Sequence, residues 1–258
     1  GLGDVYKRQV FTNTLFNSVG GREQFDEVSI QLHRTDKDDA YTNEEAMASL
    51  VISVKSKDPN LVGRLFSAKI IELALANIPG FFAQSGVKTS GPVIVYWPAL
   101  VKSKYIKEIV HVDGKDIEVE PTSQLNLEEI YYQKEPVKLE KIEIKGEREL
   151  YFGELFGTRS GDKGGCANLG VWAKNSRAFA FLYDFLTVDK LKDLLPDLQE
   201  FKIERFELAN INSLNFYIHD ILQDGVSSNN RKDGQAKSLG EYLRSKKIKV
   251  PESIIGDL

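Results

Sequence analysis

The part of this chain that most constrains its fold is a stretch of glycines and charges, Arg159-Ser160-Gly161-Asp162-Lys163-Gly164-Gly165. It separates two apolar, strand-like segments, residues 151–156 and 167–173. Glycine adopts backbone conformations that other residues avoid and lets a ligand approach the main chain closely. The pattern therefore predicts two strands joined by an ordered glycine loop, with at least one glycine at positive φ.

This loop does not match the known phosphate-binding motifs. A P-loop needs Lys and Ser or Thr after its second glycine, whereas Cys166 and Ala167 follow Gly165. A dinucleotide fingerprint opens a helix, but the segment after Gly165 alternates like a strand. A bound anion would therefore be held by a backbone nest together with Arg159 and Lys163.

The loop also contains the candidate catalytic residues. Arg159 can clamp a carboxylate or phosphate, and Asp162 beside Lys163 can act as an acid/base pair. Ser160 can donate to an oxyanion, but no histidine lies nearby in the sequence, so a serine triad is unsupported. The alternative interpretation is a hairpin connection with solvated charges.

Several further residues are candidates for substrate binding. The backbone of Gly161, Gly164 and Gly165 lines the loop, and Asn168 either orients a carbonyl or caps the loop. Cys166 is either a thiolate stabilised by Lys163 or a passive small residue. A second group of candidates for substrate binding lies at the end of a predicted strand and consists of His33, Arg34 and Asp36. The alternative interpretation of this group is a surface ion pair.

The order of predicted elements gives an α+β fold in two domains. The first contains strands at 25–33 and 50–54, a helix at 59–77, a buried strand at 92–101 and a hairpin around Asp113-Gly114. Residues 122–146 are polar and read as a connection. The second domain has the order ββαββα, which is typical of a sandwich with helices on one face of a sheet.

Composition excludes several classes of function. The 258 residues have a net charge of −4, so nothing indicates nucleic-acid binding. No apolar run approaches the roughly 18 residues of a membrane helix. The single cysteine fits a reducing compartment, hence the cytoplasm, and the three scattered histidines do not have metal-ligand spacing. The chain indicates no cofactor.

The first nine residues have no initiator Met, signal-peptide core or helical periodicity. We expect residues 1–9 to be a non-native junction and the first domain to be truncated at its N-terminus.

The chain resembles the acyclic terpene utilisation (AtuA-like) family. The residues that carry the resemblance are His33-Arg34-Thr35-Asp36, Val62-Gly63-Arg64, Pro79-Gly80-Phe81-Phe82, Val95-Tyr96-Trp97-Pro98, the glycine loop with Ala167-Asn168-Leu169-Gly170-Val171-Trp172-Ala173, Leu214-Asn215-Phe216, and Gln235-Ala236-Lys237. The resemblance implies the C-terminal portion of a large α/β first domain at 10–135 and a small ferredoxin-like domain at 147–256. The family usually has Asp at the position of Cys166.

The resemblance also implies a function. The family is associated with bacterial catabolism of citronellol- and geraniol-type terpenes, beside acyl-CoA enzymes. We expect either a lyase or hydratase step on an anionic small molecule, a carboxylate or acyl-CoA, or a non-catalytic ligand-binding or assembly module. The composition is compatible with a homo-oligomer.

Overall fold

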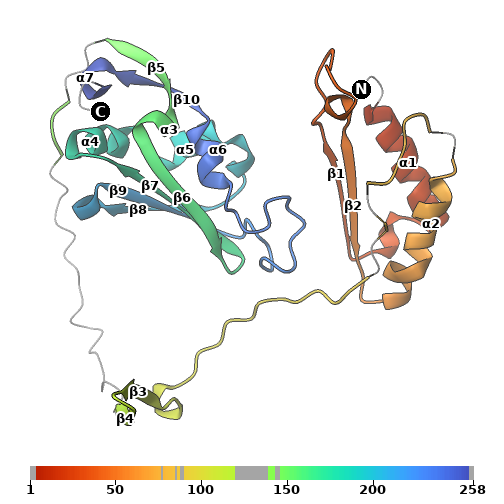
Figure 1. Cartoon of the computed structure of the whole chain (residues 1–258), viewed down its shortest axis with the longest axis horizontal. Helices are drawn as coiled ribbons and strands as arrows, with labels where there is room; N and C mark the ends of the chain where they lie inside the picture. Colours follow the sequence, from red (N-terminus) through yellow and green to blue (C-terminus); the bar gives the residue numbers. More distant parts are fainter. Residues whose placement is uncertain are drawn as a thin grey trace. The chain divides into compact units, whose positions relative to one another are not determined.

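The computed structural model describes residues 4–76, 78–84, 86–87, 90–119, 139–142 and 146–255. The chain forms two compact units, Gly1–Val93 and Ile94–Leu258 (Figure 1). The domain ranges 10–135 and 147–256 stay predictions, because much of the segment between them lies outside the described residues.

The first unit is a two-stranded antiparallel sheet with helices against one face. Strand β1 (Glu27–His33) pairs with β2 (Ser49–Lys55), so both strands expected here are confirmed. Apolar side chains at alternate strand positions, such as Ile30 and Ile52, face a core that contains Phe16 and Phe66. The helical elements are α1 (Asp4–Ser18), η1 (Arg22–Gln24), η2 (Glu44–Ala46), η3 (Leu61–Leu65) and α2 (Phe66–Leu73).

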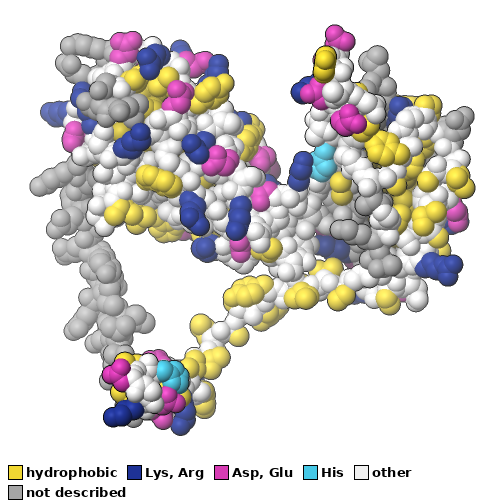
Figure 2. Space-filling view, in the orientation of Figure 1, with side chains coloured by type: hydrophobic (Ala, Val, Ile, Leu, Met, Phe, Trp, Pro, Cys, Tyr) yellow, Lys and Arg dark blue, Asp and Glu magenta, His cyan; other side chains and the backbone are white. Residues whose placement is uncertain are grey.

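Residues 4–9 form the first turns of α1, although no periodicity was visible there, and the non-native junction at 1–9 stays a prediction. Two other expectations in the N-terminal half need correction. The helix expected at 59–77 is shorter, because Gly63 leaves helical geometry (φ −84°, ψ −132°) before α2 begins. Residues 92–101 form no strand, and Trp97 is 86% exposed. Figure 2 shows hydrophobic side chains along this extended segment.

The hairpin expected around Asp113-Gly114 is confirmed. Strand β3 (Glu108–Val112) pairs with β4 (Lys115–Val119), and a short 3₁₀ turn, η4 (Ser103–Tyr105), precedes them. Asp113 and Gly114 have φ values of 48° and 71°. Positive φ at both central residues is the requirement of a type I′ turn.

The second unit contains a four-stranded antiparallel sheet in the order β6-β7-β9-β8. Its strands and helices follow the predicted order ββαββα, and a second helix, α5, follows α4. Their bounds are β6 (Phe156–Lys163), β7 (Cys166–Ala173), α4 (Ser176–Phe185), α5 (Val188–Leu194), η6 (Pro196–Leu198), β8 (Ile203–Leu208), η7 (Ala209–Ile211), β9 (Ser213–Ile218) and α6 (Leu239–Arg244).

A second strand pair flanks this sheet. Strand β5 (Glu147–Tyr151) pairs with β10 (Lys247–Pro251), which is followed by α7 (Glu252–Ile255). The strand expected at 151–156 is therefore interrupted by a helical turn, α3 (Phe152–Leu155). The Glu154 carboxylate accepts a hydrogen bond from the Tyr151 N–H at 2.6 Å, and Phe152 is buried. This turn moves the chain from pairing with β10 to pairing with β7.

The helices cover one face of the four-stranded sheet (Figure 1). Leu169, Phe216 and other alternate strand residues are buried in one core with Leu182 of α4, Leu191 of α5 and Leu243 of α6. The opposite face carries Trp172, Phe206 and Leu208, which are 43%, 48% and 41% exposed.

Candidate functional site

The stretch expected as a seven-residue loop is mostly strand. Arg159 to Lys163 belong to β6, and Lys163 pairs directly with Cys166, so the turn consists of Gly164 and Gly165 alone. Gly164 has φ 66°, which confirms the expectation of a glycine at positive φ. Gly165 is not at positive φ, and a glycine at the first central position alone is the pattern of a type II′ turn.

Gly165 is needed for a different reason. The Leu222 N–H donates to the Gly165 carbonyl at 2.8 Å, which brings the following loop against the turn. A Cβ added at Gly165 would lie 2.1 Å from the Gln223 carbonyl oxygen. The turn therefore has a structural explanation without any bound anion.

Because successive strand residues point to opposite faces, β6 divides the candidate residues into two groups. Ser160 and Asp162 pair with the buried Leu169 and Ala167, so they lie on the helix-covered face. The other group, on the opposite face, is Arg159, Gly161 and Lys163, paired with Gly170, Asn168 and Cys166. Asp162 and Lys163 are therefore not assembled beside Arg159 as one constellation.

The hydroxyl of Ser160 caps helix α6. It accepts a hydrogen bond from the Gly240 N–H at 2.9 Å and donates to the Lys237 carbonyl at 3.2 Å. Since the first N–H groups of a helix lack partners within the helix, a side chain from β6 supplies one. These two bonds account for Ser160 without a reacting carbonyl.

We call the side of the sheet opposite the helices the open face. Its central row runs across all four strands in register, from Arg159 through Gly170 and Asn215 to Phe206. The full set of open-face positions is Gly157, Arg159, Gly161 and Lys163 of β6, Cys166, Asn168, Gly170 and Trp172 of β7, Ser213, Asn215 and Tyr217 of β9, and Glu204, Phe206 and Leu208 of β8.

The polar groups near Arg159 include several hydrogen-bond donors. Among the residues that the structure describes, the Arg159 guanidinium has no ion pair or hydrogen bond. The Asn168 side-chain amide donates to the side-chain oxygen Oδ1 of Asn215 at 3.3 Å, and the Asn215 Nδ2 has no partner among the described residues. The Lys163 ammonium donates to the Asp162 carbonyl at 3.1 Å.

One end of the open face carries a linked set of titratable groups. The Tyr217 hydroxyl interacts with Cys166, and this hydrogen bond, together with burial and nearby negative charge, raises the pKa of Tyr217. His219 Nε2 lies 2.6 Å from Glu204 Oε1, and its ring contacts that of Tyr217 edge-on. The hydrogen bond to His219, followed by that to Lys202, lowers the pKa of Glu204.

The second predicted group lies in the first unit, after β1. Arg34 and Asp36 form a bidentate pair, with Nε–Oδ1 at 2.7 Å and Nη2–Oδ2 at 2.8 Å. This pairing lowers the pKa of Asp36. His33 ends β1 opposite Ser49. The guanidinium of Arg34 is thus engaged within its own loop.

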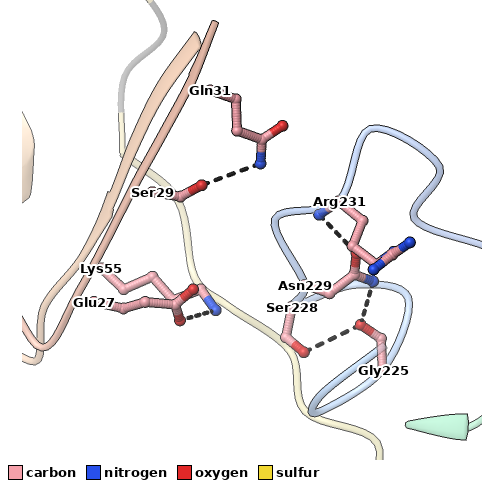
Figure 3. Close-up of polar contacts among 8 residues, drawn as sticks. All are labelled: Glu27, Ser29, Gln31, Lys55, Gly225, Ser228, Asn229 and Arg231. Carbon is pink, nitrogen blue, oxygen red and sulfur yellow. Dashed lines mark hydrogen bonds and ion pairs between the residues drawn. The ribbon is translucent and has the colours of Figure 1, made fainter. Parts of the chain in front are cut away.

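Figure 3 shows further polar contacts in each unit. On the sheet of the first unit, the Gln31 amide donates to Ser29, and Lys55 pairs with Glu27. In the second unit, Asn229 organises the loop before α6. It donates to the Gly225 carbonyl at 2.9 Å and accepts from the Arg231 N–H at 3.0 Å.

Sequence reasoning missed Trp172, Asn215 and Tyr217 as open-face residues. The signal was the alternation of Leu169, Val171 and Ala173 in one segment and of Leu214, Phe216 and Ile218 in the other, which places the intervening residues on the opposite face.

Two negative findings apply to the described part of the chain. It contains no group of three or more His, Cys, Asp or Glu residues that could hold a metal ion. None of its helices is both long and apolar enough to cross a membrane.

Two family models match the sequence. The model of the acyclic terpene utilisation family protein AtuA matches residues 1–112, and the AtuA ferredoxin-like domain matches residues 152–249. The second match covers the four-stranded sheet and its helices. Searches of curated proteins and of solved structures gave no match.

Proposed function

Because the chain belongs to the acyclic terpene utilisation (AtuA) family, we propose that it binds a terpene-derived carboxylate or acyl-CoA on the open face of its ferredoxin-like domain. The proposal includes a place beside acyl-CoA enzymes in the bacterial, cytoplasmic breakdown of citronellol- and geraniol-type terpenes. The ligand in this proposal is a small anion. The proposal is compatible with a protein that forms a homo-oligomer.

The observation that carries the proposal is the environment of Arg159. Arg159, which has no partner among the described residues, lies on the sheet face opposite the helices of its own unit, beside the side-chain amides of Asn168 and Asn215. A guanidinium only donates and carries a positive charge, and it matches the two oxygens of a carboxylate, whereas each side-chain amide can donate or accept. The charge of Arg159 therefore favours binding of an anion over binding of a cation.

The first prediction removes this guanidinium. Arg159→Ala is expected to weaken binding of citronellate (3,7-dimethyloct-6-enoate) or its CoA thioester by about 1.5–3 kcal/mol, the range of a hydrogen bond to a charged group. That corresponds to roughly 10- to 150-fold in the dissociation constant. Isothermal titration calorimetry on the full chain measures it.

Arg148→Ala is the matched control, because Arg148 is an exposed strand arginine of the same unit that lies on β5. Its affinity should equal that of the unchanged chain. Equal effects of the two substitutions, or no binding of either ligand to the unchanged chain, would refute the proposal.

A lyase or hydratase step on such a substrate is the second candidate. It is favoured by the His219–Glu204 pair and the neighbouring Tyr217 and Cys166, since a held imidazole can transfer protons. Asp162 and Lys163, the predicted acid/base pair, lie on opposite faces of β6. Turnover of an α,β-unsaturated acyl-CoA that is lost in His219→Gln and retained in Asp162→Asn would place this candidate first.

A further inference from the structure

Two glycines, Gly161 and Gly170, lie in the middle of the open face, and we call them the glycine floor. At Gly161, an added Cβ would meet no atom within 4 Å, and at Gly170 it would meet only the Arg159 carbonyl oxygen at 3.6 Å. Neither residue is at positive φ, so neither glycine is needed for its backbone conformation. The space above these two residues is therefore open, and it lies directly beside Arg159 and the Asn168–Asn215 pair.

Apolar side chains border this floor on the side away from Lys163. The Trp172 indole lies against Gly157, where an added Cβ would come within 2.2 Å of the ring. Ser213 separates Trp172 from Leu208, and its hydroxyl already donates to the Ile211 carbonyl at 2.8 Å. Phe206 ends the central row. The face thus changes from cationic and amide groups to exposed apolar groups across its width.

We propose that the glycine floor is the subsite for the branched aliphatic chain of a carboxylate whose head group binds Arg159. The chain crosses Gly170 and Ser213 toward Phe206 and Leu208, with Trp172 as a side wall. The inference rests on the proposed function and deepens it, because it makes the acyl chain, and not only the anionic group, a determinant of binding.

Charge and dimensions favour this occupant. The central row spans three inter-strand steps of about 4.8 Å, roughly 14 Å from Arg159 to Phe206, which accommodates an eight-carbon backbone. Ligand sites combine mainly apolar walls with a few polar groups that orient the ligand, as this face does. A second copy of the chain would place two Arg159 side chains on apposed faces, where the Glu204 carboxylate is already paired with His219 and Lys202.

The test varies the length of the ligand's acyl chain and, separately, fills the space above the glycine floor with a side chain. Calorimetric titrations of the full chain use 3-methylbutanoate, 3-methylhexanoate and citronellate. Each methylene buried should raise affinity roughly fourfold. Gly170→Val adds a side chain that strands favour, in space that no side chain occupies. It should weaken citronellate binding at least tenfold and change 3-methylbutanoate binding by less than twofold.

Two further variants support this comparison. Gly91→Val is the control, because its added Cβ meets nothing within 4 Å and Gly91 belongs to the first unit and not to this sheet. It should leave all three affinities unchanged. Trp172→Ala removes the side wall without filling the floor, and it should weaken citronellate binding at least fivefold even if Gly170→Val does not fold.

The outcomes separate the two proposals. If affinity depends on Arg159 but is the same for all three acids and for Gly170→Val, the proposed function stands and the acyl subsite is wrong. If no Arg159-dependent binding occurs, both are wrong. A dimer in sedimentation analysis that Trp172→Ala dissociates, together with equal affinities for the three acids, would assign the face to a second copy and overturn the subsite.

Discussion

At the level of single residues, the glycines of β6 and its turn have different physical roles. Gly164 provides the positive φ of the turn, and Gly165 makes room for the Gln223 carbonyl. Gly161 meets neither condition, and the proposed acyl subsite would explain it. Composition alone cannot separate these cases, because each is decided by what lies within a few ångströms of the missing Cβ.

This difference predicts opposite effects of one substitution at two positions. Gly165→Ala should lower the free energy of unfolding by about 1–3 kcal/mol, because overpacking forces the loop away from the turn. Gly161→Ala should raise it by roughly 0.5–1 kcal/mol, because alanine loses less conformational freedom on folding than glycine. Urea unfolding monitored by circular dichroism measures both. A loss of similar size at the two positions would contradict the assignment.

At the level of elements, β6 connects the sheet to α6 through its covered face. Ser238, the residue before the helix, makes no side-chain cap, and its hydroxyl donates to Asp233 at 2.7 Å. Burial opposes ionisation of Asp233, but hydrogen bonds from the Ser238 side chain and nearby backbone N–H groups outweigh it, and its pKa is lowered. The cap of α6 therefore comes from Ser160.

Ser160→Ala is expected to lower the free energy of unfolding by about 1–2 kcal/mol, because a helix N–H and a carbonyl lose their partner. Binding of citronellate should be unchanged, since the hydroxyl lies on the face opposite Arg159. Ser245→Ala is the matched control, because that exposed hydroxyl bonds only within its own turn. Thermal unfolding and calorimetry measure the two effects. Loss of binding at full stability would instead support a catalytic or binding role for Ser160.

Strands with strict alternation could be predicted from the sequence, and those that depend on a distant partner could not. β1, β2, β7 and β9 follow their apolar periodicity. The strand character of β6 was missed because Gly and charged residues are typical of loops, while its pairing with β7 outweighs that preference. Residues 92–101 are the opposite case. Their apolar composition is typical of a strand, but they form none, because a strand also needs a neighbouring strand to pair with.

The candidate site was predictable only in part. Arg159, Lys163 and Asn168 were identified as candidates and do lie on one face, but their roles stay predictions. Asp162 and Ser160 were grouped with them because a loop brings neighbours together, whereas a strand separates them. Asn215 and Trp172 join the face through register, which the sequence of either strand alone does not specify.

At the scale of the whole molecule, each unit has its own core, and the open face belongs to the second unit. The first unit packs Phe11, Phe16, Phe25 and Phe66 between its helices and β1–β2. Its predicted polar residues Arg34 and Asp36 are paired with each other. The binding hypothesis therefore assigns the ligand to the ferredoxin-like domain.

The most direct test of this claim is to map citronellate binding on the full chain by amide NMR. We expect the largest ¹H–¹⁵N shift changes at the backbone amides of Gly161 and Gly170 and at the side-chain amides of Asn168 and Asn215. Amides of α4 and α6, on the covered face, should change little, and Arg159→Ala should abolish the changes. Shift changes confined to the residues around His33 and Arg34, or to the helices, would contradict the account.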